Sequence, residues 1–404
     1  MPHTRSVCLS IFLGVGSRYE NDAEAGVSHF IEHLLFKGTE KRPTSRDISE
    51  AIEGVGGIFN GGTGKEVAVY WCKVAQPHFP IALDVLSDML LHSKFDPREI
   101  EKERQVIIEE INMNKDSPAQ QVDMLIDELL WPGHPLGRDV AGSKESVGAI
   151  TRETMLRYLE SHYLPDNTVV AVAGNIQHKE VAAAISQALG DWKKQGAPPE
   201  FLGYREQLGQ RLRIEKRDTE QAHLCLALPG ISLFHPRRFS LDLLNIILGD
   251  GMSSRLFTEI RDRLGLAYSI HSYVDHFLDS GAVFIYAGVE PEKLETAVKA
   301  VLEELRKLAE ESIPEAEIIK AKEYSKGRLL LRLEDSHNVA GWLGGQEVLL
   351  KQILSPDEVI AIIDAITAEE LRQIARELLL SEKLRLAVVG PIPGDAPLER
   401  LLKI

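Results

Sequence analysis

Apolar residues recur with the period of an α-helix over residues 27–38. Intervals of three and four residues between them are typical of a helix that buries one face, and Gly38 is typical of a helix end. The apolar positions are Val27, Phe30, Ile31, Leu34 and Leu35. The pattern therefore predicts one short amphipathic helix.

Three polar side chains lie on the opposite face of this predicted helix. At 100° per residue His29, Glu32 and His33 avoid the apolar stripe, and the two histidines are one turn apart, close enough to reach one metal ion. A pair of core histidines is disfavoured because they avoid the stripe. A solvated polar face remains an open alternative, since most polar helix faces meet water. The short motif alone does not decide between them.

Similar patterns predict the elements that follow. Thr44 and Asp47 are spaced as in a capping box, which predicts a helix that ends at the glycines of residues 54–57. Residues 57–74 hold glycines between two strand-like runs and predict a β-hairpin. Further helices are predicted near 78–92, 96–114, 118–131, 151–162 and 178–189, with a strand at 167–175.

The second half of the chain repeats the first. Residues 150–175 match residues 366–391 at a constant offset, and both have the pattern of a helix followed by a strand. Residues 96–120 resemble residues 313–340 at nearly the same offset. The sequence therefore predicts an α+β protein with two homologous domains, each a mixed or antiparallel sheet covered by helices.

A stretch rich in glycine, proline and polar residues lies between the two copies. Such composition is typical of a linker. We therefore predict a metal-binding domain at residues 1–190, a linker at 191–212 and a homologous domain without metal at 213–404.

Only the first copy carries the polar trio. The segment of the second copy that matches the histidine helix, residues 240–248, has no histidine, and Lys326 stands where the first copy has Glu110. The same domain is thus built without these side chains. This contrast indicates that the histidines serve chemistry and are not required by the fold.

Composition narrows the classes of function. The chain has 404 residues, of which 44% are hydrophobic and 26% charged, as in ordinary globular proteins. The formal net charge of -15 argues against a nucleic-acid partner. Cys8, Cys72 and Cys225 lie in apolar strand-like runs and predict buried thiols in a reducing compartment. No apolar run is long enough to cross a bilayer and no secretory signal is recognisable, so we predict a cytoplasmic protein without a membrane partner.

The predicted helix at 96–114 offers carboxylates for a third metal ligand. Its candidates are Glu101, Glu103, Glu109 and Glu110. Glu103 and Glu110 share one face of the helix, whereas Glu109 points about 100° away. A solvated acidic helix is the alternative, and composition alone favours it.

Taken together, these motifs resemble a known family. His-x-x-Glu-His followed downstream by a glutamate resembles the inverzincin signature, and the chain is similar to the pitrilysin and insulysin family of zinc metallopeptidases. Within the family it resembles the half-size members, such as the catalytic beta subunit of mitochondrial processing peptidase. The resemblance covers essentially the whole chain, through the motifs GVGSRYE, HFIEHLLFKGT, GGIFNGGT, ERQVIIEEI, HPLGR and DGMSSRLFTEIRDRLGLAYS.

The resemblance implies roles for five residues of the first domain. His29, His33 and Glu110 would bind one zinc ion per chain and leave one position open for a water molecule. Glu32 would be the general base that takes a proton from this nucleophilic water and gives it to the leaving amine. Glu103 would support catalysis or orient a ligand histidine from outside the metal's own ligands.

The resemblance also implies substrate-binding residues. Arg261 and Tyr268 match the family's Arg-x6-Tyr pair, which contacts substrate and helps to stabilise the oxyanion; without the resemblance they read as a helix-surface arginine and a strand tyrosine. Asn60 and Gly61 match the edge strand that binds peptide backbone by strand addition. Gly61 replaces the alanine usual in the family, which leaves backbone bonding intact and adds flexibility.

Function and partners follow as expectations from the resemblance. We expect a zinc-dependent endopeptidase that hydrolyses peptides or unfolded presequence-like segments in an enclosed chamber. Because full-length relatives enclose the substrate between two halves, we expect a homodimer, or a heterodimer with a related subunit. Relatives begin with a further strand before the segment found here at residues 2–7, so the first domain is expected to lack an edge strand. The alternative function is a catalytically silent peptide-binding or partner subunit of a heterodimeric processing peptidase.

Overall fold

The protein folds into two compact units. The computed structural model describes residues 1–192, 197, 199–207, 209–392 and 398–404, so part of the predicted linker lies outside the described residues. The first unit consists of Met1–Asn112, Arg138–Leu202 and Leu331–Ile353. The second unit consists of Met113–Gly137, Gly203–Leu330 and Leu354–Ile404.

The first unit is built on an antiparallel sheet. Its four strands have the order β2-β3-β1-β4, which makes β2 and β4 the edge strands. The strands are β1 (Ser6–Leu13), β2 (Ile58–Thr63), β3 (Ala68–Ala75) and β4 (Thr168–Gly174). The helices are α1 (Val27–Leu35), α2 (Ser45–Glu53), α3 (Phe79–His92), α4 (Pro97–Asp116, apart from its last turn), α6 (Lys144–Ala149), α7 (Arg152–His162), α8 (His178–Leu189) and α12 (Ser336–Leu350).

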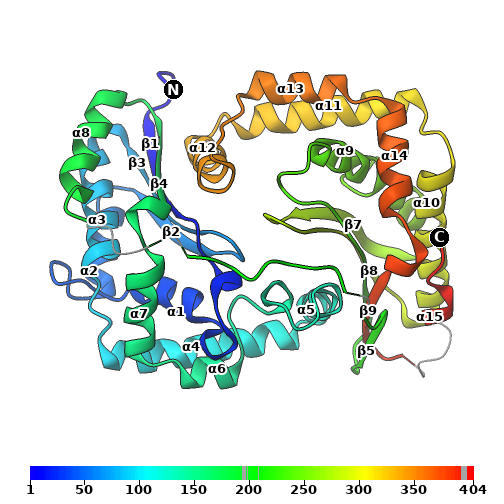
Figure 1. Cartoon of the computed structure of the whole chain (residues 1–404), viewed down its shortest axis with the longest axis horizontal. Helices are drawn as coiled ribbons and strands as arrows, with labels where there is room; N and C mark the ends of the chain where they lie inside the picture. The colour runs from blue at the N-terminus through cyan, green and yellow to red at the C-terminus, as the bar shows by residue number, and fades with distance from the viewer. Residues whose placement is uncertain (193–196, 198, 208, 393–397) are drawn as a thin grey trace. The chain divides into compact units, whose positions relative to one another are not determined.

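Helices cover both faces of this sheet. Leu9 and Ile11 of β1 point into the main core, which includes α1 and α3, because side chains alternate between the faces of a strand. Cys8 and Phe12 point the other way, into a smaller cluster with α12. Figure 1 shows α3 and α12 on opposite sides of the sheet. At the closest approach Gly344 of α12 meets the ring of Phe12, where a larger residue would clash.

The second unit is built on a mixed sheet. Its five strands have the order β5-β9-β6-β8-β7, and only β5 and β9 are parallel. The strands are β5 (Leu212–Lys216), β6 (Ala222–Pro229), β7 (Ala267–His276), β8 (Gly281–Val289) and β9 (Arg385–Gly390). The helices are α5 (Pro118–Leu130), α9 (Arg238–Leu248), a π-helix (Phe257–Arg263), α10 (Leu294–Glu310), α11 (Glu315–Arg332, apart from its last two residues), α13 (Pro356–Ala365), α14 (Ala368–Leu378) and α15 (Leu398–Leu401).

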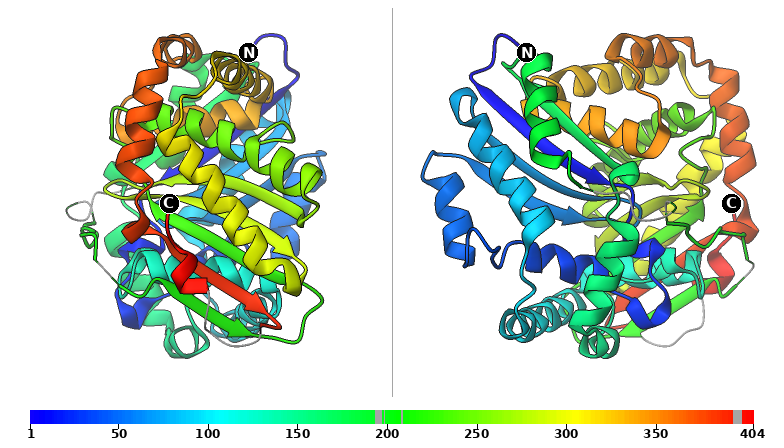
Figure 2. Two further views of the ribbon diagram at one scale, coloured as in Figure 1. Left: turned by 90° about the vertical axis from the view of Figure 1, so that its right-hand side faces the viewer. Right: turned by 60° about the vertical axis from the view of Figure 1, so that its left-hand side comes forward.

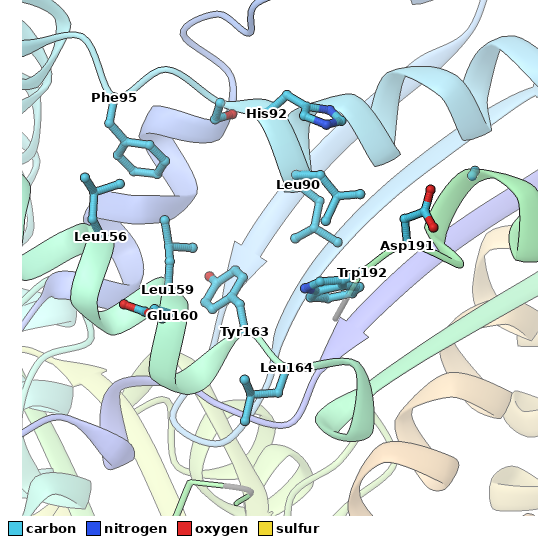
Figure 3. A pocket seen from close by; sticks show the side chains of 13 residues that line it. Leu90, His92, Phe95, Leu156, Leu159, Glu160, Tyr163, Leu164, Asp191 and Trp192 are labelled. Atoms are coloured by element: carbon cyan, nitrogen blue, oxygen red, sulfur yellow. The ribbon is translucent and has the colours of Figure 1, made fainter. Parts of the chain in front are cut away.

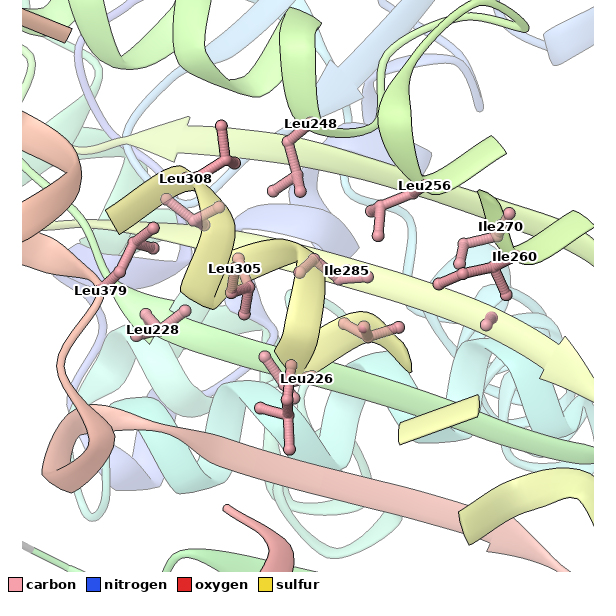
Figure 4. Close-up of a cluster of buried hydrophobic side chains, with 14 of the residues drawn as sticks. Leu226, Leu228, Leu248, Leu256, Ile260, Ile270, Ile285, Leu305, Leu308 and Leu379 are labelled. Atoms are coloured by element: carbon pink, nitrogen blue, oxygen red, sulfur yellow. The ribbon is translucent and has the colours of Figure 1, made fainter. Parts of the chain in front are cut away.

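The core of the second unit also has two layers. Leu226 and Ile285 lie in a large aliphatic cluster with Leu305 of α10 and Leu379, which Figure 4 shows from close by. On the other face of the sheet Cys225 and its neighbours pack against α5. Burial of this much aliphatic surface is the main source of the unit's stability.

Each unit takes one helix from the other half of the sequence. α12 covers β1 and β4 in the first unit, and α5 covers β6 and β9 in the second. The two compact units therefore do not coincide with the continuous ranges 1–190 and 213–404. Those ranges follow the repeat in the sequence.

The predicted fold class is confirmed. Helices cover a purely antiparallel sheet in one unit and a mixed sheet in the other, and the order β7-β8-β6-β9 repeats the order β2-β3-β1-β4. The predicted capping box at Thr44 is present, with the side chains of Thr44 and Asp47 each bonded to the other's backbone N–H. All three cysteines are buried and free of disulfides, as predicted. No helix in the described part of the chain combines the length and apolar character needed to cross a membrane.

The two sheets differ at one edge. β9 has β5 beside it (Figure 2, left), whereas in the described residues no strand pairs with the outer side of β4. The backbone N–H of Arg217, directly after β5, donates to the carbonyl oxygen of Gly390 at 3.1 Å. The amino group of Met1 makes the matching bond to Gly174 at 2.9 Å. Apolar side chains of β4, α8 and α12 line a cavity of about 560 Å³ beside this edge.

Candidate metal centre

The helix α1 is capped at its amino end by the carboxylate of a residue shortly before it in the sequence. Gly26, the residue before the helix, has φ +92° and lies so close to the carbonyl oxygen of Ala141 that a side chain there would clash. With no side-chain cap of its own, the helix receives one from Glu20. The carboxylate of Glu20 accepts the backbone N–H of Gly26 at 2.7 Å and of Ser28 at 2.8 Å.

Glu20 is buried, and this has an electrostatic consequence. Burial raises the pKa of its carboxyl group to about 7, although the two backbone N–H donors and Arg138 act in the opposite direction. The start of α1 therefore rests on a group that titrates near neutral pH.

The face of α1 opposite its buried stripe contributes to a cluster of metal-ligand type. Atoms of His29, His33 and Glu110 all lie within 4.8 Å of one another. Nε2 of His29 lies 3.8 Å from Oε2 of Glu110, and Nε2 of His33 lies 3.7 Å from the same oxygen. Tetrahedral zinc with ordinary bond lengths has ligand atoms roughly 3.3 Å apart, so these two separations lie within about half an ångström of that value. α1 and α4 thus bring together the three residues predicted as ligands.

The second ring nitrogen of His33 has a carboxylate partner. Nδ1 of His33 lies 3.1 Å from Oε2 of Glu103, whose other oxygen is 2.7 Å from the ammonium group of Lys37. Burial opposes the charged form of Glu103, but the hydrogen bonds from His33 and Lys37 outweigh it and lower the pKa of this carboxyl. Because an ionised carboxylate can only accept, Nδ1 of His33 donates to Glu103, and Nε2 of the same ring faces Glu110.

His29 has a different environment. Burial, followed by the nearby His33, lowers its pKa, so its imidazole is neutral at pH 7. Its Nδ1 is buried and has no hydrogen-bond partner among the described residues, while its Nε2 faces Glu110. Two imidazoles and one carboxylate are a donor set that suits zinc.

Glu32 lies one residue before His33 on the same helix. Oε2 of Glu32 accepts a hydrogen bond of 2.5 Å from the hydroxyl of Thr63 on β2. On α4, Glu109 is exposed and is not part of the three-residue cluster, and Glu101 pairs with Arg104 at the surface. The structure therefore distinguishes Glu103 and Glu110 from the other two carboxylates of this helix.

Comparisons with known proteins identify the family. A model described as insulinase, peptidase family M16, matches residues 1–144, and one described as the peptidase M16 inactive domain matches residues 149–324. The chain belongs to peptidase family M16. It is 36% identical over 401 residues to the uncharacterized zinc protease YmxG of Bacillus subtilis, with 98% of this chain and 95% of that protein covered. It is 37% identical over 398 residues to an uncharacterized zinc protease of Streptomyces coelicolor, with 97% and 86% covered.

A solved structure supports the fold assignment. The crystal structure of a protease from Helicobacter pylori aligns with a TM-score of 0.92 at 23% identity, covering 96% of this chain and 95% of that one. At this identity the likeness concerns the fold alone. The family and the names of the relatives indicate a zinc protease of the M16 type. The inactive-domain match includes residues 240–248, the segment of the second copy that has no histidine.

Arg261 and Tyr268 of this M16 chain lie in the second unit. Arg261 is on the π-helix at Phe257–Arg263 and Tyr268 is near the start of β7. The guanidinium of Arg261 lies 5.0 Å from the ring centre of Tyr268 and 4.7 Å from that of Phe257. Tyr268 is 77% exposed, which is unusual for a large aromatic residue and leaves it available for contact.

Asn60 and Gly61 lie on the edge strand β2, opposite Trp71 and Tyr70 of β3. A side chain at Gly61 would come within 3.0 Å of Cγ of Glu32, so this glycine sits directly against the predicted general base. The side chain of Asn60 accepts the N–H of Gly61 at 2.9 Å.

A large cavity lies elsewhere in the first unit. Figure 3 shows this space of about 620 Å³, lined by apolar residues such as Leu90, Leu159 and Trp192 with His92 and Asp191 among them. None of the predicted metal ligands lines it. We do not assign it a function.

Three residues at the centre were not predicted from the sequence. Glu20, Lys37 and Thr63 each lie inside motifs that carried the family resemblance, GVGSRYE, HFIEHLLFKGT and GGIFNGGT. Lys37 follows His33 at the helical interval of four, which could have suggested a shared partner. Glu20 and Thr63 carry no spacing signal, because their contacts with α1 depend on the tertiary fold.

Proposed function

We propose that this M16 chain is a zinc-dependent endopeptidase. The observation that carries the proposal is the convergence of His29, His33 and Glu110, from two helices far apart in sequence, with Glu32 beside them. The internal repeat lacks these residues, which supports a chemical role for them.

In this proposal His29, His33 and Glu110 would hold zinc, with Nε2 of each histidine and Oε2 of Glu110 facing one another. When bound, zinc supplies a Lewis acid that lowers the pKa of a water molecule to about 7. Glu103 fixes the tautomer and ring orientation of His33, and Lys37 holds the carboxylate of Glu103 in place.

Glu32 transfers a proton between the attacking water and the leaving amine in this proposal. Its carboxylate accepts a proton from the water that attacks the peptide carbonyl and donates it to the leaving amine, as a general base and then a general acid. The two histidines that would hold the metal lie on the same helix α1, so one rigid helix would position both the base and two of the ligands.

The substrates in this proposal are peptides or unfolded presequence-like segments. Gly61 and Asn60, on the edge strand β2, would pair with the backbone of an extended peptide. Arg261 and the exposed Tyr268 would contact the substrate and stabilise the oxyanion. We further propose a dimer in which these two residues serve the metal centre of the other subunit.

Replacement of the general base tests the mechanism. Glu32→Gln keeps the size of the side chain but removes its basicity, so we expect full zinc content and a loss of turnover of about 10²-fold to 10⁴-fold. Zinc analysis and cleavage of a quenched peptide library would be compared for the wild type, Glu32→Gln and the exposed control Glu50→Gln. Equal activity of Glu32→Gln and the wild type would overturn the mechanism. An inactive wild type that binds zinc would favour the silent-subunit alternative.

A further inference from the structure

The general base contacts the strand β2 at two points. At the end of its side chain, Oε2 of Glu32 accepts the hydroxyl of Thr63 at 2.5 Å. Along its stem, Cγ of Glu32 passes 3.0 Å from the place a side chain at Gly61 would occupy. Residues 61 and 63 face the same side of the strand because side chains alternate along it. β2 therefore contacts both the carboxylate and the stem of the Glu32 side chain.

The position of the Thr63 hydroxyl is set by the backbone around it. Thr63 is the last residue of β2 and is paired with Ala68 of β3. Directly after it, the backbone N–H of Gly64 donates to the carbonyl oxygen of Val67 at 2.8 Å and closes the hairpin. A β-branched residue has few χ1 rotamers, so a fixed backbone also fixes the hydroxyl.

Glu32 needs such a partner to act as a base. The final torsion of a glutamate is broad, and the carboxylate can rotate about it unless a hydrogen bond holds one oxygen. With Oε2 occupied by Thr63, Oε1 is the oxygen left to take the proton from the attacking water. Misorientation of a catalytic group lowers the rate of the chemical step without weakening substrate binding.

We propose that Thr63 is a positioning residue that holds the carboxylate of Glu32 in its catalytic orientation. This inference rests on the proposed function, since it assumes that Glu32 is the general base. Thr63 itself does not need to touch the substrate, and Gly61 leaves the space in which the stem of Glu32 lies.

Two substitutions of Thr63 test the role of its hydroxyl group separately from the role of its methyl group. Thr63→Val keeps the shape and is well tolerated in strands, so we expect normal folding, normal zinc content and a KM within twofold of the wild type. We expect its kcat to fall about tenfold, since one hydrogen bond to a charged group is lost. Thr63→Ser keeps the donor and should restore kcat to within threefold of the wild type. Thr168→Val is the matched control, because Thr168 is also a strand threonine, whose hydroxyl donates to Leu164 at 2.7 Å.

The outcomes distinguish this inference from the proposed function. Wild-type kcat in Thr63→Val, with Glu32→Gln inactive, would overturn the positioning role and leave the general base in place. A loss of zinc in Thr63→Val, or an equal loss of kcat in Thr63→Ser, would assign Thr63 a purely structural role and also overturn the inference. Full activity of Glu32→Gln would overturn the proposed function itself. In the double variant Glu32→Gln/Thr63→Val we expect no further loss beyond Glu32→Gln, because the two residues act as one unit.

Discussion

Nδ1 of His33 lies 3.1 Å from Oε2 of Glu103. Glu103 is buried, and its second oxygen pairs with Lys37, so the carboxylate has little freedom to turn away from the imidazole. A histidine held in this way presents its other nitrogen in one tautomer and one orientation, which is how outer carboxylates strengthen metal binding.

We predict that Glu103→Gln weakens zinc binding. The carboxamide is a poorer partner for His33, and its NH₂ group cannot pair with Lys37, so the zinc dissociation constant should rise about tenfold to a hundredfold. Competition with a chelator of known affinity measures this. Glu101→Gln, on the exposed side of the same helix, is the matched control and should bind as the wild type does. Equal affinities for both variants would contradict the role given to Glu103.

The raised pKa of the Glu20 carboxyl group predicts that the stability of the protein depends on pH. Its pKa is about 7 in the folded protein, against an ordinary value of 4.5. A carboxyl whose pKa is raised by folding contributes stability that is fully present below pH 4.5 and is lost as the pH rises through 7. The shift corresponds to a loss of roughly 3 kcal/mol across this range. Glu20→Gln cannot titrate, so its stability should change less between pH 5 and pH 8.

Urea unfolding at pH 5 and pH 8 checks the Glu20 prediction. The decrease in midpoint between the two pH values should be smaller for Glu20→Gln than for the wild type. Glu50→Gln, an exposed substitution on α2, should follow the wild type. Parallel behaviour of Glu20→Gln and the wild type would show that burial does not control this carboxyl.

The proposed dimer, in which a second subunit completes the active site, predicts complementation between two inactive variants. Glu32→Gln and Arg261→Ala should each be inactive alone. In a mixed dimer, however, an intact metal centre of one subunit meets an intact Arg261 of the other. After subunit exchange an equal mixture should recover about a quarter of wild-type activity, because half of the dimers are mixed and each has one complete site.

Size-exclusion chromatography with light scattering would measure the oligomeric state of each variant and of the mixture used in the complementation experiment. A mixture that stays inactive although it forms mixed dimers would place Arg261 and the metal centre of one chain in the same site. An active monomer would remove the need for a second subunit altogether.

Local pattern was enough to predict most elements of the fold. The helix at 151–162 and the strand at 167–175 were predicted from periodicity and caps, and α7 and β4 lie there within one residue at each end. The repeat in the sequence also predicted two homologous domains, because similar patterns at a constant offset build the same domain, and the two sheets do share one strand order.

The exchange of α5 and α12 between the units could not be predicted in this way. Hydrophobic periodicity shows that a helix has an apolar face but not which sheet covers it. α12, for example, packs with Gly344 against the ring of Phe12, and these two residues are far apart in the sequence. The same limit applies to the metal centre. His29 and His33 follow from helical spacing, whereas Glu110 was chosen through the family resemblance, and Thr63 reaches Glu32 only through the packing of β2 on α1.

The outer side of β4 has a consequence for handling this protein. In the described residues no strand pairs with this side, so backbone N–H and C=O groups of β4 face outward there. An extended apolar segment of another molecule would find partners for its own backbone along this edge. A charged or proline-containing segment that covered the edge would shield it from pairing between molecules during purification.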